Sequence, residues 1–386
     1  MNLSAGESDR LESFPVARKR IFLGHAGVTA LPARSARAMK EYIDSSSQDQ
    51  QEFDGVLKEI SLTRRDAAAL IGAEADEIAL LGPTSLGISL FANGIDWKVG
   101  DEVVVYVDDY PANVYPWLNL QHRGVVVKWL KTELLGKITM ADVEASLTPS
   151  TRLVALASCH FQTGWRIDIT AIGSMLNEKG ILFSLDAIQT LGAFPTPVEH
   201  VDFLSADAHK WLLGPLAAGI VYVSKDRFAE CRPTLLGSWN IKSPDFLAQS
   251  VIEFEDGGRR YEPGVLNVAG IYGMRASINL IAEQGLERVS SLILERRDQL
   301  ESGLAGLGFE FLSPRSHDPL RSGILTTRHP SKDPANLYSD LQKASISASY
   351  RRTRDHGFWL RFSPHFYNTA SEIDRVIEIL SKAIKS

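Results

Sequence analysis

The sequence predicts an α/β fold in which helices cover both faces of a mostly parallel sheet, followed by a smaller α+β region. Two observations support this fold class. From about residue 78 to residue 223, short apolar runs rich in β-branched residues alternate with longer segments of helical period. Continuous apolar strands separated by helices are typical of parallel sheets that are buried on both sides. After about residue 265 the pattern changes to long helices and short strands.

The expected strands are short apolar runs bounded by polar or glycine-containing segments. In chain order they are residues 78–81, 103–107, 125–130, 153–157, 181–185, 201–206 and 219–223. Helical spacing of apolar residues occurs between them, for example at 86–94, 114–121 and 169–178. Ligands are expected outside the carboxyl ends of such strands.

The C-terminal third reads as two long helices, four strands and a closing helix. The helices are expected at 266–283, 286–307 and 371–385, and the strands at 309–312, 323–327, 346–349 and 358–362. Residues 259–264 are rich in Gly, Arg and Pro and are expected to form an exposed loop. We expect three parts: an N-terminal segment (1–30) that joins the small domain, a large domain (31–265), and a bridging helix with the small domain (266–386).

Composition excludes several classes of protein. The 386 residues carry 41 basic and 47 acidic side chains, a net charge of −6, and 44% of them are apolar. Disordered and disulfide-stapled chains are therefore excluded, and a general binder of nucleic acid or anionic membranes is disfavoured. The two cysteines, Cys159 and Cys231, lie far apart, which indicates a reducing compartment. No signal peptide and no apolar run of about 18 residues is present, so we expect a cytoplasmic, soluble protein without a metal site.

The strongest chemical signal lies between residues 181 and 223. One apolar run leads into Asp186, and the next ends in Asp207-Ala208-His209-Lys210. An acid and a lysine thus follow neighbouring strands, where a doubly wound sheet binds ligands. Partial burial between His209 and Trp211 would lower the lysine pKa and free its amine for Schiff-base chemistry. A lysine that extends along the surface is the alternative.

This segment resembles the cofactor site of the class V aminotransferases, a group that includes cysteine desulfurases and isopenicillin-epimerase-like proteins. The matching residues are Asp186, Gln189, His209-Lys210 and Gly214-Pro215. The resemblance implies fold type I of the pyridoxal-phosphate (PLP) enzymes, with a seven-stranded sheet, and it extends over nearly the whole chain. It also implies PLP as cofactor and a small α-amino acid as substrate.

The resemblance assigns a role to each of these residues. Asp186 would keep the ring nitrogen of PLP protonated, and Lys210 would form the Schiff base and then shuttle protons. Gln189 would bind the ring's 3′-oxygen, and His209 would lie near the phosphate. For Gln189 alone, a surface position at a helix start is the alternative.

Further cofactor contacts are implied upstream. Thr84 and Ser85 begin a helical run after a short strand, and hydroxyl residues at a helix start can bind anions. The family binds its phosphate at this turn, although a plain helix cap is the alternative. Tyr110 would stack on the pyridine ring. His160 and Gln162, in the loop after residues 153–157, are weaker candidates for contacts with cofactor or substrate.

Arg361 is the expected ligand of the substrate carboxylate, because a planar guanidinium suits bidentate pairing. A buried ion pair is its alternative role. His25 and Gly27 belong to a segment that resembles the family's opening segment, which lines the substrate pocket. The arginines near residue 351 could form a nucleic-acid patch, but a solvated or active-site-rim loop fits the net charge better.

Three departures from the family pattern qualify the resemblance. Residues 351–358, where cysteine desulfurases carry a catalytic cysteine, contain none. Asp207 stands where a serine is frequent, and its carboxylate is expected to point away from a phosphate. Residues 259–267 resemble a loop that reaches the neighbouring subunit, with Val265 where Thr is frequent. The resemblance implies a homodimer with shared active sites.

The expected activity is therefore that of a class V aminotransferase. A PLP-dependent β-lyase (including a C–S lyase) ranks second and an amino-acid epimerase third, and the sequence contains no clean discriminator among them. Cysteine desulfurase activity is disfavoured by the missing cysteine. A catalytically silent scaffold is the rival from another class, disfavoured because Asp186, Gln189, Lys210 and Arg361 are all present.

Overall fold

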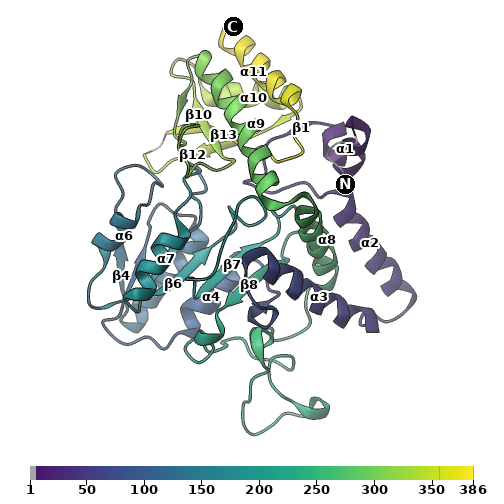
Figure 1. The fold of residues 1–386 in the computed structure, drawn as a ribbon, viewed down its shortest axis with the longest axis vertical. Helices are drawn as coiled ribbons and strands as arrows, with labels where there is room; N and C mark the ends of the chain where they lie inside the picture. The colour runs from purple at the N-terminus through teal and green to yellow at the C-terminus, as the bar shows by residue number, and fades with distance from the viewer. Residues whose placement is uncertain (1–5, 356, 386) are drawn as a thin grey trace.

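The computed structural model describes residues 6–355 and 357–385, and a seven-stranded sheet forms the centre of its larger part (Figure 1). The strand order is β2-β8-β7-β6-β5-β3-β4, and only β8 runs against its neighbours. The bounds are β2 (Ile78–Ala79), β3 (Glu102–Val105), β4 (Val126–Trp129), β5 (Thr151–Ala157), β6 (Leu182–Asp186), β7 (Phe203–Asp207) and β8 (Gly219–Val223). The predicted mostly parallel sheet is confirmed.

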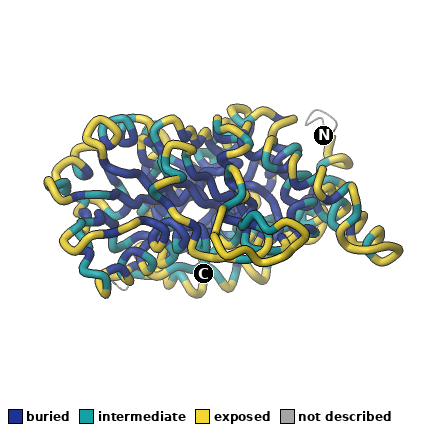
Figure 2. Tube along the Cα trace, turned by 90° about the horizontal axis from the view of Figure 1, so that it is seen from below, coloured by how far each residue is buried: buried dark blue, intermediate teal, exposed yellow. Residues whose placement is uncertain are grey.

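The sheet is buried on both faces because side chains alternate along each strand. In β3, Val103 and Val105 pack with α4 and α5 on one face, whereas Val104 faces the cluster formed with α3, α7 and α8. The central strands are accordingly buried through the middle of the molecule (Figure 2). This arrangement is the physical reason that the strands read as continuous apolar runs in the sequence.

Eleven α-helices are found among the described residues. They are α1 (Glu7–Ser13), α2 (Ala33–Gln48), α3 (Asp54–Ile71), α4 (Thr84–Gly94), α5 (Tyr115–Leu118), α6 (Met140–Ser146), α7 (Ile169–Glu178), α8 (Val268–Gln284), α9 (Leu286–Gly306), α10 (Pro334–Lys343) and α11 (Ala370–Lys385). Shorter 3₁₀ helices are η1 (Pro15–Arg18), η2 (Ala75–Glu77), η3 (Pro111–Asn113), η4 (Asn119–Arg123), η5 (Lys225–Arg227), η6 (Pro244–Phe246) and η7 (Gly257–Tyr261). In the described part of the chain, none of these helices combines the length and apolarity needed to cross a membrane.

The C-terminal part contains an antiparallel sheet ordered β12-β13-β10-β9. Its strands are β9 (Glu310–Phe311), β10 (Leu325–Arg328), β12 (Ser349–Arg352) and β13 (Phe358–Phe362). A separate parallel pair joins β1 (Ile21–Phe22) to β11 (Ile346–Ser347), and the adjacent Leu23 packs in the apolar cluster of this part. The long helix α9 rises from the end of α8 along this sheet (Figure 1).

Three local expectations were wrong. The expected helix at 114–121 is divided into α5 and η4, and the expected strand at 346–349 is divided between β11 and β12. The expected exposed loop at 259–264 begins inside η7, and Tyr261 and Glu262 within it are buried. Glu262 is held there because it forms an ion pair with Arg64 and accepts a hydrogen bond from the N–H of Leu80 at 2.8 Å.

Close packing of α4 on the sheet positions its first turn. A Cβ added to Gly87 would lie 2.4 Å from Oγ of Ser205, so only glycine lets the helix approach β7 this closely. The Ser205 hydroxyl donates to the carbonyl of Thr84 at 3.0 Å, and the N–H of Asp207 donates to Oγ1 of Thr84 at 2.9 Å. The start of α4 is thereby fixed beside the carboxyl end of β7.

Candidate active site

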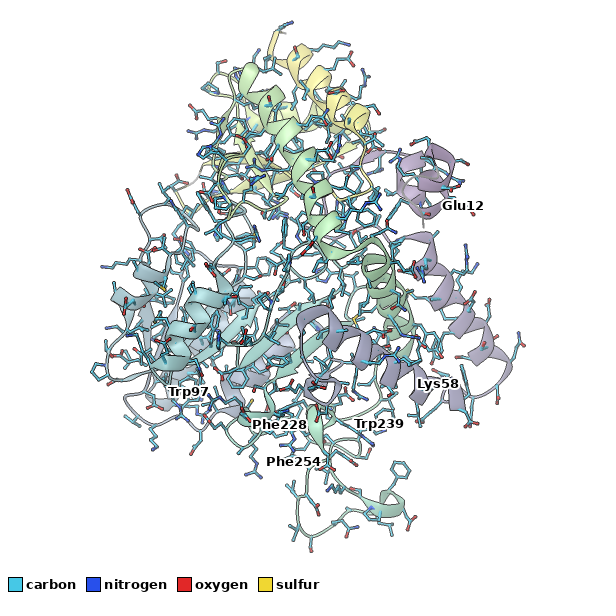
Figure 3. All side chains as sticks on the ribbon, in the orientation of Figure 1. Glu12, Lys58, Trp97, Phe228, Trp239 and Phe254 are labelled. Carbon is cyan, nitrogen blue, oxygen red and sulfur yellow. The ribbon has the colours of Figure 1, made fainter. Side chains whose placement is uncertain are left out.

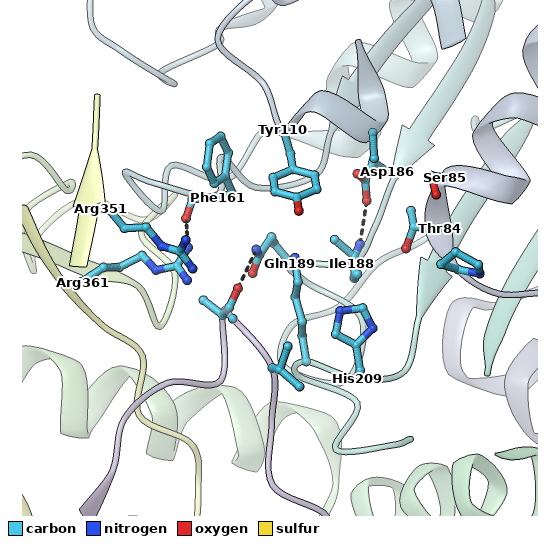
Figure 4. Close-up of a pocket in the computed structure, with 16 residues that line it drawn as sticks. Thr84, Ser85, Tyr110, Phe161, Asp186, Ile188, Gln189, His209, Arg351 and Arg361 are labelled. Atoms are coloured by element: carbon cyan, nitrogen blue, oxygen red, sulfur yellow. Dashed lines mark hydrogen bonds between the residues drawn. The ribbon is translucent and has the colours of Figure 1, made fainter. Parts of the chain in front are cut away.

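A cavity of ≈ 310 Å³ lies at the carboxyl ends of the parallel strands, within the size range of small-molecule sites. It is lined by the first turn of α4 and by the loops after β3, β5, β6 and β7. Residues 26–28 and the β12–β13 hairpin complete its wall, so the N-terminal, central and C-terminal segments all contribute to it (Figure 4). The cavity lies at the edge of the sheet where a ligand site was expected.

Lys210 lies inside the cavity and is only 7% exposed. Its Nζ is 5.2 Å from the centroid of the Tyr110 ring. Burial lowers the pKa of Lys210 to about 8. The charge of Asp186 opposes this shift, whereas the charges of Arg361 and Arg351 add to it. The surface alternative for this lysine is therefore excluded, and its amine is neutral in a large fraction of molecules near pH 8.

Asp186 is the last residue of β6 and lines the same cavity. Its Oδ1 accepts a hydrogen bond from the N–H of Ile188 at 3.0 Å (Figure 4). Burial raises the pKa of this carboxyl, and the Ile188 N–H and the charge of Lys210 oppose that rise. A buried carboxylate of this kind is stabilised by a cationic N–H group brought to it by a ligand.

The first turn of α4 is suited to an anion. Thr84 and Ser85 line the cavity, and no side chain caps this helix start. Thr84 Oγ1 accepts from Asp207, and among the described residues no acceptor takes the proton of its own hydroxyl. The hydroxyl proton and the first-turn N–H groups can therefore be donated to a phosphate.

His209 and Asp207 form a pair at one side of the cavity. Nδ1 of His209 lies 2.8 Å from Oδ1 of Asp207, and the His209 ring lines the cavity. Asp207 does not line it, because its oxygens also accept from the N–H groups of His209 and Ala217. The carboxylate is thus held by these backbone N–H groups outside the cavity.

Gln189 lines the cavity and is held by two hydrogen bonds. Its Nε2 donates to the carbonyl of Ala26 at 3.2 Å, and its Oε1 accepts from Nε1 of Trp211 at 2.8 Å. These bonds connect the turn after β6 to the N-terminal segment and to the loop after β7. A surface position for Gln189 is excluded by its burial.

Arg361 extends from β13 into the cavity and is 1% exposed. Its Nη1 donates to the carbonyl of Phe161, and Nη2 is 3.5 Å from Oγ of Ser349. No acidic side chain pairs with it in the described part of the chain, so the expected alternative of a buried ion pair is not found. Burial and the charge of Arg351 lower the pKa of Arg361 to about 9. An anionic ligand would relieve this cost.

His25 does not line the cavity, so its expected place in the pocket was wrong. The ring is fully buried, with Nδ1 2.9 Å from the carbonyl of Ser363 and Nε2 3.0 Å from the hydroxyl of Tyr367. Both ring nitrogens are occupied by these partners, which orient the ring into the core. Gly27, two residues later, does line the cavity.

The two weaker candidates after β5 also lie outside the cavity. The ring nitrogens of His160 contact Thr163 Oγ1 and the carbonyl of Asp108, both at 2.9 Å. Gln162 donates from Nε2 to the carbonyl of Arg352 at 2.7 Å, which connects this loop to β12. The residue between them, Phe161, lines the cavity instead and meets the Tyr110 ring edge-on at 5.3 Å.

Two further residues have positions at the site that the sequence analysis did not assign to them individually. Asp109 is buried beneath the loop that carries Tyr110 and accepts from the N–H groups of Tyr110 and Ala157 and from the side chain of Asn113. Burial and the charge of Asp186 raise the pKa of Asp109 to about 7. Arg351 lines the cavity from β12. The pairing of Ser349 with Arg361 in the β12–β13 hairpin places Arg351 on the same face, a signal available once both strands are recognised.

A family model described as aminotransferase class-V matches residues 21–376, which include every residue that lines the cavity. The chain belongs to the aminotransferase class-V family. The members of this family are PLP-dependent enzymes, so the resemblance found in the sequence is confirmed, as is the fold.

Relatives match along nearly the whole chain. A probable cysteine desulfurase from Methanothermobacter thermautotrophicus is 28% identical over 395 residues, which cover 97% of both proteins. The uncharacterized aminotransferase YcbU of Bacillus subtilis is 25% identical, with 96% of each chain covered. The apo structure of a cysteine desulfurase from Thermococcus onnurineus NA1 shares the fold with a TM-score of 0.90 at 22% identity, covering 98% of each chain.

The chemistry of the cavity fits the family's cofactor. A neutral amine at Lys210 suits an aldehyde, the buried carboxylate of Asp186 suits a cationic ring N–H, and the start of α4 suits a phosphate. Their arrangement in one cavity of ≈ 310 Å³ is the observation on which this fit depends.

Proposed function

We propose that the protein is a PLP-dependent aminotransferase that acts on a small α-amino acid. Lys210, Asp186, Gln189, Tyr110, His209 and the hydroxyls of Thr84 and Ser85 would hold the cofactor, and Arg361 would bind the substrate carboxylate. Bound PLP supplies an electron sink that labilises the bonds at the substrate Cα. The proposal is supported above all by the position of Lys210, Asp186 and the start of α4 around one cavity, and the lowered pKa of Lys210 agrees with it.

The side chains of the cavity have separable tasks. Arg361 would fix the substrate by charge-assisted hydrogen bonds to its carboxylate, which orients Cα toward Lys210. The amine of Lys210, with its pKa of about 8, can accept and return a proton close to neutral pH. Asp186 would stay ionised next to a cationic N–H and so stabilise negative charge that develops in the reaction. Tyr110 and Phe161 would help to exclude water.

A β-lyase is the second candidate, and one observation favours it over a persulfide-forming desulfurase. Several relatives are named cysteine desulfurases, yet both cysteines of this chain, Cys159 and Cys231, are fully buried. Neither lines the cavity, and burial raises their pKa values to about 11 and about 12. Without a reactive thiol, sulfur chemistry would have to proceed by elimination alone. An epimerase ranks third.

One experiment separates these activities. The protein loaded with PLP is incubated with a panel of amino acids while the cofactor spectrum and the released products are followed. Transamination predicts pyridoxamine phosphate together with a keto acid. Keto acid with ammonia or sulfide indicates a lyase, and exchange of the α-hydrogen with solvent deuterium without net product indicates an epimerase. The absence of any change with the whole panel would contradict the proposed enzyme activity.

We further propose a homodimer. The segment that precedes η7 and contains η6 projects from the large part of the molecule, and Trp239 and Phe254 lie where it joins the body (Figure 3). This loop exposes Phe246, Leu247, Val251 and Ile252, four large apolar side chains that would be covered by a second copy. Sedimentation of the purified protein tests the proposal: a dimer is expected, and a monomer at micromolar concentration would contradict it.

A further inference from the structure

Two arginines, rather than one, face the substrate side of the cavity. Arg351 and Arg361 extend together from the β12–β13 hairpin toward the Phe161 end of the pocket (Figure 4). A Cβ built on Gly27 would lie 3.7 Å from Nη2 of Arg361 and 3.8 Å from Nη2 of Arg351. The two guanidinium groups therefore border the same small space beside Gly27.

The protein does not neutralise this pair of charges. Among the described residues, neither arginine forms an ion pair with a carboxylate, and the buried Nε atoms of both have no hydrogen-bond partner. The carboxylates whose charges act on Lys210 are Asp186, which lines the cavity, and Asp207, which does not. Asp186 is proposed to face the cofactor ring, and Asp207 is bonded to His209 and Ala217. Neither of these two carboxylates therefore neutralises Arg351 or Arg361.

The backbone around Arg351 is fixed to the large part of the molecule. The carbonyl of Arg352 accepts from Gln162 at 2.7 Å. Arg354 forms an ion pair with Asp108 and donates to the carbonyl of Val107 at 2.8 Å. Arg351 is therefore presented to the cavity from an edge strand that pairs with β13 and is held to the large part just after Arg351. A freely solvated arginine would not require such support.

We propose that Arg351 is a specificity-determining residue that binds a second acidic group, so that the substrate is an α-amino acid whose side chain ends in an acid. Arg361 takes one carboxylate, which leaves Arg351 for the other anionic group. The inference rests on the proposed function and defines its substrate class. Two adjacent guanidinium groups without an internal acid repel each other, and a ligand carrying two negative charges relieves that repulsion.

The competing explanation is that both arginines hold the same α-carboxylate. Binding of amine-free acids separates the two explanations, because such acids report recognition without turnover. Calorimetry on the PLP-loaded protein compares succinate and glutarate with propionate and butyrate. The wild type should bind each dicarboxylate at least about tenfold more tightly than the matched monocarboxylate, as expected for a charge-assisted contact.

Arg351→Gln should remove this preference and leave the affinity for monocarboxylates within about twofold, a range that corresponds to less than half a kcal/mol. The matched control is Arg352→Gln, the next residue on β12, whose side chain is exposed; it should retain the preference. If Arg351→Gln weakens the binding of dicarboxylates and of monocarboxylates equally, both arginines hold the same carboxylate and the proposal is overturned. A wild type without preference for dicarboxylates would also overturn it, even if the variant does not fold.

Turnover identifies the second acidic group. Aspartate and glutamate test a carboxylate, and cysteine sulfinate and cysteate test a sulfur acid, each against alanine and 2-aminobutyrate. Acidic substrates should show the higher kcat/KM, and Arg351→Gln should raise their KM. A higher kcat/KM for the neutral amino acids would contradict the inference. The cofactor absorbance, read first, shows separately whether the proposed PLP function holds.

Discussion

The amine of Lys210 lies 5.2 Å from the centre of the Tyr110 ring, inside a cavity that also contains the carboxylate of Asp186. An ammonium over an aromatic face gains about 0.5–2 kcal/mol. Burial nevertheless lowers the lysine pKa to about 8, despite the opposing charge of the Asp186 carboxylate. The environment of Lys210 therefore favours a reactive neutral amine, which is the form that condenses with an aldehyde.

This pKa predicts how fast the apoprotein takes up PLP as a function of pH. Because only the neutral amine reacts, the rate of Schiff-base formation should rise with pH to a plateau with a midpoint near 8. The rate is measured by the growth of visible absorbance after PLP is added at a series of pH values. A midpoint near 10.5, the ordinary lysine value, would show that the amine is solvated.

The same pKa predicts the pH dependence of apoprotein stability. The pKa of Lys210 is about 8 in the folded protein and 10.5, the ordinary lysine value, in the unfolded chain. Between these values the unfolded chain binds more protons, so stability rises with pH. Below pH 8 the buried ammonium costs up to about 3 kcal/mol, at 1.36 kcal/mol per unit. Lys210→Met should therefore stabilise the apoprotein at pH 7, with the difference fading toward pH 10.5. Urea denaturation at pH 7 and at pH 10.5 measures the difference in unfolding free energy between the variant and the wild type. The same difference at both pH values would contradict the lowered pKa of Lys210.

Asp186→Asn tests the role of the carboxylate. The asparagine can still accept the hydrogen bond from Ile188, but it carries no charge to hold a ring N–H cationic. We expect PLP to bind while kcat falls by about 10²-fold or more, because the loss is felt where negative charge develops. Steady-state kinetics and a cofactor titration give the two quantities. Full activity in this variant would remove Asp186 from the mechanism.

Arg361→Ala should weaken the binding of carboxylate substrates by about 1.5–3 kcal/mol, the usual value of a lost hydrogen bond to a charged group. The effect should appear mainly in KM, and Arg361→Lys should recover part of it because the charge remains while the bidentate geometry is lost. Thermal denaturation of both variants controls for the buried position of Arg361. If amines without a carboxylate are the natural substrates, their kinetics should be unaffected by either change.

Much of the large sheet could be predicted from sequence because its strands are buried on both faces and read as apolar runs. Asp186 and Asp207 stand at strand ends as expected, since strand ends in a parallel sheet place polar residues at one edge. Helices α2 and α3 were not identified, although Val56, Ile60, Ala67 and Ile71 recur at helical spacing on the buried face of α3. Their burial depends on packing against α8, a contact between distant segments.

The residues around the cavity were harder to predict where contacts between segments distant in the sequence decide which way a side chain faces. Phe161 faces the cavity although His160 and Gln162 were the named candidates, because the bonds of these two polar neighbours turn them toward Asp108 and β12. His25 carries the residue type expected in an active site, but two partners from residues 363 and 367 hold it in the core. Arg351 was named only as part of a solvated or rim loop, and its place in the cavity follows from strand register.

Chemical trapping tests the central claim most directly. The PLP-loaded protein is reduced with borohydride, digested, and its peptides are mapped by mass spectrometry. The account predicts one reduced cofactor on the peptide that contains Lys210, no label in Lys210→Ala, and normal labelling in a control that replaces the exposed Lys131. Label on another lysine in the wild type, or a wild type that takes up no PLP at all, would contradict it.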